Sequence, residues 1–201
     1  MLPMRTCGRL VAVAGALLLL LAPEARSTTL VQMNLADLAG RANKIFRGTV
    51  LSVKPGTVAA GGGELPILIY RVRVDEKFKG EFGEGKQADF VEIRMVGAIK
   101  EPKRDDNLRK FSLWRDVPRL DRGQEYVLFT TTPSRIGLST TVGLGQGTFQ
   151  IRDAGKEETA VNAFGNAGLA RGMAANTPIT RASGPLSYRE LAQAIRSVVA
   201  K

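Results

Sequence analysis

Strand-like patterns follow one another through the middle of this 201-residue sequence and restrict the folds that it can adopt. The longest pattern covers residues 67–78, where apolar positions alternate with positions that become charged toward the end of the stretch. Such an alternation, with a period of two, is typical of a strand that buries one face. Shorter patterns predict further strands over residues 45–53, 88–95, 126–129, 139–144 and 147–151. We therefore expect a mainly β fold.

Two of the predicted strands indicate the shape of the sheet. Gly48 interrupts the first of them, and a glycine inside a strand usually marks a bulge or a tight bend. Residues 126–129 are apolar at consecutive positions, which indicates a central strand that is buried on both faces. Five or six strands with glycine-marked bends favour a small closed β-barrel of the OB-fold type over residues 44–152. A β-sandwich is the alternative architecture.

A helix is predicted on each side of these strands. Asn34 with Asp37, and Ser187 with Glu190, have the spacing of a capping box at a helix N-terminus. The first helix should be short, because Gly40 weakens it soon after it begins. The second helix has an apolar stripe at helical spacing, made of Tyr188, Leu191, Ile195 and Val198. We expect this stripe to pack the C-terminal helix against the barrel.

The composition of the chain changes after the last predicted strand. Residues 160–184 are rich in Ala, Gly and Asn and show no sustained period. We therefore expect an OB-like barrel domain over residues 28–153. Residues 154–201 should then form a flexible connector followed by the C-terminal helix.

The first 27 residues have the three-part pattern of a secretory signal peptide. Two arginines precede an apolar run at residues 10–22, and small residues at positions 25 and 27 fit cleavage before Thr28. The run has 13 residues, whereas a membrane-spanning helix needs about 20. We expect an exported chain, periplasmic or extracellular, with no transmembrane segment after cleavage.

Two residue types that carry much enzyme chemistry are missing from the expected mature chain. The sequence has no histidine, and its single cysteine, Cys7, lies within the predicted signal peptide. This excludes Ser-His-Asp and Cys-His catalysis, thiolate chemistry, and zinc or iron sites built on histidine or cysteine. Catalysis by carboxylates, lysine or tyrosine stays open, but no arrangement of residues indicates it. We predict no catalytic residue, no metal ligand and no cofactor.

The segment 100–122 is the best candidate for a binding surface. It contains eight basic and five acidic residues, together with a phenylalanine and the only tryptophan of the chain. Aromatic rings among basic side chains can dock an anionic surface, because the charges attract the partner and the rings pack against it. Alternatively, the aromatic residues fix a long loop to the barrel while the charges keep it soluble. The candidate partner-binding residues are Arg109, Lys110, Phe111, Trp114 and Arg115.

Several short stretches, in order, resemble a recurring group of uncharacterised secreted bacterial proteins. Their architecture is similar to the OB-fold domains of the tissue inhibitors of metalloproteinases and the netrins. The stretches are residues 28–31, 45–50, 79–80, 117–120, 123–129 and 145–149. The resemblance implies an OB-fold over residues 28–151. Animal inhibitors of this kind depend on a cysteine at the mature N-terminus, which this chain lacks, so their mechanism of inhibition does not transfer.

These observations predict a secreted, non-enzymatic binding module of the bacterial cell envelope. Its partner would be an anionic envelope component or another envelope protein, docked through segment 100–122, and nucleic acid is not expected. Two other functions stay open at this point. One is a protease inhibitor or accessory domain, by analogy of fold, and the other is a carboxylate-dependent hydrolase.

Overall fold

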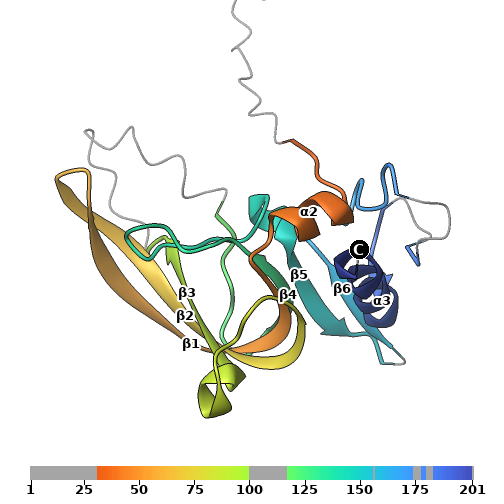
Figure 1. Cartoon of the computed structure of the whole chain (residues 1–201), viewed down its shortest axis with the longest axis horizontal. Helices are drawn as coiled ribbons and strands as arrows, with labels where there is room; N and C mark the ends of the chain where they lie inside the picture. Colours follow the sequence, from red (N-terminus) through yellow and green to blue (C-terminus); the bar gives the residue numbers. More distant parts are fainter. Residues whose placement is uncertain (1–30, 100–116, 156, 174–177, 180–182, 201) are drawn as a thin grey trace, which may run out of the picture. The chain divides into compact units, whose positions relative to one another are not determined.

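The computed structural model describes residues 31–99, 117–155, 157–173, 178–179 and 183–200. Nearly all of these residues belong to one compact unit, Gln32–Lys201. Its strands form a single antiparallel sheet of seven strands in the order β3-β2-β1-β4-β5-β6-β7, accompanied by two α-helices (Figure 1). The expected mainly β fold is confirmed.

The strands are β1 (Lys44–Ala60), β2 (Gly63–Lys79), β3 (Phe90–Val96), β4 (Glu125–Thr130), β5 (Thr148–Asp153), β6 (Glu158–Val161) and β7 (Leu186–Ser187). The helices are α2 (Leu35–Arg41) and α3 (Tyr188–Val199), and short 3-10 helices cover Gly85–Asp89 and Leu144–Gly147. The strand predicted over residues 139–144 is not formed. Thr141 makes only an isolated bridge to Thr130, because the chain turns directly into the second 3-10 helix.

The closed barrel expected from the sequence is not confirmed. The edge strands of the sheet are β3 and β7, and these two strands do not pair with each other. The described residues link the β3 edge to the chain after β4 by one backbone hydrogen bond, from Ser139 N to Arg94 O at 2.9 Å. The strand β7 has two residues before α3 begins, which leaves little backbone for pairing.

The predicted bend at Gly48 is present. The register between β1 and β2 shifts between Arg47 and Gly48, as it does at a β-bulge. A Cβ atom at Gly48 would clash with the carbonyl oxygen of Arg73 on the neighbouring strand. The bend therefore requires glycine, because the two backbones approach each other more closely than any side chain allows.

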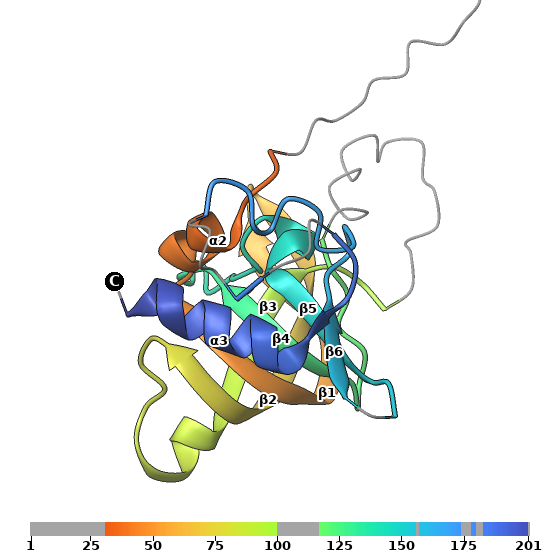
Figure 2. The same ribbon diagram turned by 90° about the vertical axis from the view of Figure 1, so that its right-hand side faces the viewer.

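Strand β4 separates two hydrophobic cores. Val127 and Phe129 belong to a core with α2, α3, β5, β6 and β7, while Tyr126 and Leu128 belong to a core with β1, β2 and β3. All four side chains are at most 4% exposed, so the prediction of a central strand buried on both faces is confirmed. Figure 2 shows α3 lying across the sheet on the side of the first core.

Both predicted capping boxes are formed. Asn34 accepts a hydrogen bond from Asp37 N at the start of α2, and Ser187 accepts one from Glu190 N at the start of α3. Leu191 and Ile195 of α3 are completely buried, and Val198 packs partly buried against the same core. The expected packing of the C-terminal helix is thereby confirmed.

The sheet continues beyond residue 153, where the sequence placed the domain boundary. Strand β6 pairs with β5, and the turns that follow it are held by two buried asparagines. Asn166 donates to the carbonyl oxygens of Ala160 and Gly184, and Asn162 donates to that of Gln146. These described parts of the expected connector are therefore joined to the sheet by hydrogen bonds.

Candidate functional site

Residues 100–116 lie outside the described part of the chain, and with them all five predicted partner-binding residues: Arg109, Lys110, Phe111, Trp114 and Arg115. The structure does describe the residues on both sides of this stretch. These flanking residues show how the chain before and after the stretch is attached to the sheet.

Arg119 joins the two ends of the stretch. Its guanidinium group donates to the carbonyl oxygens of Ala98 and Ile99, which follow strand β3. Two residues on the returning side are anchored in the core: Leu120 is 3% exposed, and Val117 packs partly buried against the same cluster. Arg119 is one of the eight basic residues of segment 100–122. Its guanidinium group is engaged by backbone carbonyl groups of the domain.

A cluster of charged residues connects β1 with the start of α3. Arg47 of β1 donates from Nε to Oε1 of Glu125 at 2.5 Å, and from Nη1 and Nη2 to both oxygens of Glu158 at 2.8 and 2.6 Å. The centre of its guanidinium group lies 4.1 Å from the ring centroid of Tyr188. The Tyr188 hydroxyl donates to Glu76, which also pairs with Arg196 of α3.

This cluster keeps Arg47 charged and Tyr188 neutral. Burial works against the charge of Arg47, but the hydrogen bonds to Glu125 and Glu158 outweigh it and raise the pKa of the guanidinium above its ordinary value. Burial raises the pKa of the Tyr188 hydroxyl, and its hydrogen bond to Glu76 raises it further. The cluster therefore acts as a permanent electrostatic connection between the sheet and α3.

The two carboxylates that converge in this cluster do not have the surroundings of a hydrolase site. A general acid or base must face the group with which it exchanges a proton. Glu125 and Glu158 instead face the same guanidinium, and Arg47 occupies both oxygens of Glu158. Within the described ranges, no group of three or more acidic residues is placed to hold a metal ion. The carboxylates are best explained as partners of Arg47.

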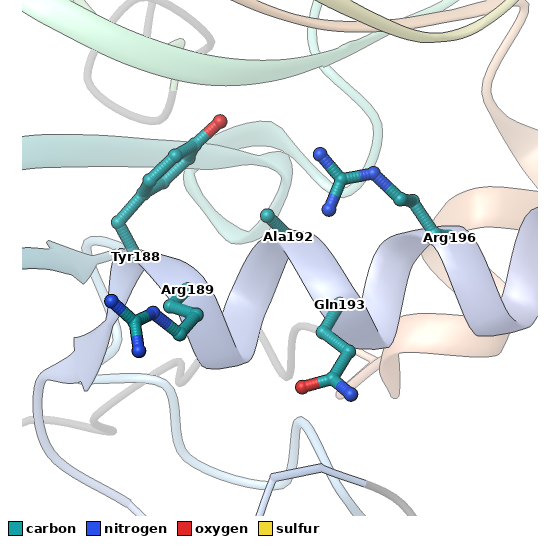
Figure 3. A pocket seen from close by; sticks show the side chains of 5 residues that line it. All are labelled: Tyr188, Arg189, Ala192, Gln193 and Arg196. Atoms are coloured by element: carbon teal, nitrogen blue, oxygen red, sulfur yellow. The ribbon is translucent and has the colours of Figure 1, made fainter.

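An open pocket lies along helix α3, lined by Tyr188, Arg189, Ala192, Gln193 and Arg196. Figure 3 shows Tyr188, Ala192 and Arg196 on one side of the helix and Arg189 and Gln193 on the other. The two arginines therefore do not converge on one point. Arg196 is moreover paired with Glu76, so this pocket does not form a concentrated site for an anion.

Sequence reasoning did not find the Arg47 cluster. Its members come from β1, β2, β4, β6 and α3, and their spacing in the chain follows no motif. The only local signal was Glu125 immediately before an apolar strand, which alone indicates no partner.

Comparison with known proteins adds no family: no family model and no curated protein matches the sequence. Among the residues that the structure describes, no helix is both long and apolar enough to cross a membrane.

Proposed function

We propose that this chain is an exported, non-enzymatic binding module of the cell envelope that docks an anionic partner through segment 100–122. The basic excess and the two aromatic residues of the segment supply the chemistry. Lysine and arginine attract an anionic surface over a distance set by the ionic strength, and the aromatic rings add packing at contact.

The hydrogen bonds from Arg119 to Ala98 and Ile99 are the structural observation that supports this proposal. Arg119 donates to the carbonyl oxygens of Ala98 and Ile99, so the described residues that precede and follow residues 100–116 lie next to each other. Leu120, buried in the core, fixes the returning end. An insertion attached in this way can carry a binding function without changing the sheet, as binding loops on rigid scaffolds do.

We also propose that the domain is related to the OB-fold and that the chain is exported by means of a cleaved signal peptide. The bulge at Gly48 and the meander β1-β2-β3 suit an OB-type arrangement, and the apolar run at residues 10–22 suits a signal peptide. N-terminal sequencing of protein recovered from the envelope or the medium tests the second point. The mature form should begin at or near Thr28, and an exported form that begins at Met1 or Leu2 would contradict export by cleavage.

The binding test reverses three charges of the segment. Arg109, Lys110 and Arg115 are replaced together by Glu, and the binding of the protein to envelope extract is measured between roughly 50 and 500 mM salt, over which screening becomes strong. Wild-type binding should weaken with salt, and the triple variant should bind much less than the wild type at low salt. A matched variant with Arg41, Arg152 and Arg189 replaced by Glu changes the charge equally outside the segment and should still bind. Equal binding by all three proteins would overturn the proposal.

A further inference from the structure

The outer face of strands β1, β2 and β3 holds a regular array of cations around Arg71. In the strand register, Arg71 lies opposite Ser52 on β1 and opposite Glu92 on β3. The next row on one side has Lys54 on β1 and Arg94 on β3, and the next row on the other has Arg73 on β2 beside Phe90 on β3. We call Lys54, Arg71, Arg73, Phe90 and Arg94 the Arg71 platform.

The cations of the platform differ in whether an acidic side chain neutralises them. Arg73 pairs with Asp75 at 2.7 Å and Arg94 with Glu92 at 2.8 Å. Glu92, the direct neighbour of Arg71 on β3, is thereby engaged by another arginine. Arg71 is exposed and has no acidic partner among the described residues. The array therefore has an excess of positive charge, and Arg71 is its unneutralised centre.

The guanidinium group of Arg71 is held in position by an aromatic ring. Its central carbon lies 4.4 Å from the ring centroid of Phe90, which is partly buried. A cation at this distance from an aromatic ring is attracted to the face of the ring. The contact with Phe90 therefore restricts the position of the Arg71 guanidinium before any ligand arrives.

We propose that the Arg71 platform binds a linear acidic glycan, with Arg71 as the central oxyanion contact. Cations two residues apart on one strand face lie about 7 Å from each other, so the array offers repeated contacts to an extended polyanion. A membrane surface fits less well. The exposed large apolar residues of the described chain are Val31, Ile99, Ile136 and Phe164, and none belongs to the platform. The platform also lies outside segment 100–122, so it stands or fails independently of the proposed function.

The test measures binding of the purified full protein to dextran sulfate and to vesicles of phosphatidylglycerol with phosphatidylcholine. Arg71→Gln should weaken binding to dextran sulfate about fivefold, close to 1 kcal/mol. Phe90→Leu, which leaves the charge unchanged, should weaken it too, because the guanidinium loses its support. Arg189→Gln removes the same charge from an exposed position on α3 and should change binding less than about twofold.

Three results would overturn the proposal that the Arg71 platform binds an acidic glycan. Equal loss in Arg71→Gln and Arg189→Gln would show that only net charge matters. No loss in Phe90→Leu would show that the contact between Phe90 and Arg71 does not contribute to binding. The variant with Arg109, Lys110 and Arg115 replaced by Glu keeps the platform, so its behaviour separates this inference from the function of the segment. Tighter binding of this variant to the vesicles than to dextran sulfate would contradict a glycan.

Discussion

The two halves of the sheet differ in how many of their faces are buried. On β4, the consecutive residues Leu128 and Phe129 are both completely buried, because a hydrophobic core lies on each side. On β2, Val72 is completely buried while its neighbour Arg71 is exposed. The helices α2 and α3 account for the difference, since they cover the half around β4 and the end of β2 near Glu76 and Phe78 but leave β2 open to solvent around Arg71. The covered half contributes most to stability, and the open half is the one on which we propose a binding surface.

Alanine substitutions at neighbouring positions should reproduce this difference, with the largest effects in the covered half. Phe129→Ala and Leu128→Ala should each lower the free energy of unfolding by about 3 kcal/mol or more, since both leave cavities. Val72→Ala should cost about 2 kcal/mol, whereas Arg71→Ala should leave the urea midpoint nearly unchanged. A large loss in Arg71→Ala, or a small one in Leu128→Ala, would contradict the assignment of one open and two buried faces.

Two arginines allow a second comparison between the covered and the open half of the sheet. The side chain of Arg47 is 15% exposed and pairs with two carboxylates beneath α3, while that of Arg73 is 52% exposed and pairs with Asp75 on the open face. Arg47→Met should cost about 3 kcal/mol, because it leaves Glu125 and Glu158 partly buried without a counter-charge. Arg73→Met should leave the unfolding midpoint unchanged within error. Similar losses in urea unfolding would show that burial does not distinguish the two pairs.

A smaller effect is expected from the tyrosines at alkaline pH. Burial raises the pKa of Tyr70, Tyr126 and Tyr188, and these are the three tyrosines of the chain. The unfolded chain ionises its tyrosines near pH 10, whereas the folded chain resists ionisation. Their contribution to stability is therefore complete below about pH 10 and is lost as the pH rises through the raised values. Ultraviolet titration should show less tyrosinate at pH 10 in the folded protein than in the urea-unfolded chain, and equal ionisation in the two states would contradict this.

Features that depend on neighbouring residues were predicted well from the sequence. The capping boxes at Asn34 and Ser187 satisfy backbone donors within three residues, and the bend at Gly48 depends on a missing side chain. The apolar run at residues 126–129 indicated a doubly buried strand without any knowledge of what covers it. In each case the signal itself consists of a few neighbouring residues.

Features that depend on distant partners were not predicted. Strand β1 continues to Ala60, beyond residue 53 where the predicted strand ends, because β2 supplies a partner along its whole length. The short β6 is stabilised by β5 and by the buried Asn166, neither of which its own composition indicates. The Arg47 cluster draws on five elements, so no single stretch could reveal it. Long-range pairing overrides local preference at these positions.

The central claim is that segment 100–122 binds a partner and can be altered without harm to the fold. Trp114→Ala tests it most directly, with binding to envelope extract and the melting temperature measured on the same preparation. Our account predicts that binding falls while the melting temperature stays the same, since the described residues that form the sheet and both cores all lie outside residues 100–116. A melting temperature that drops by several degrees would contradict it. That result would indicate that Trp114 fixes the segment to the domain, because truncating a buried tryptophan costs about 3–5 kcal/mol.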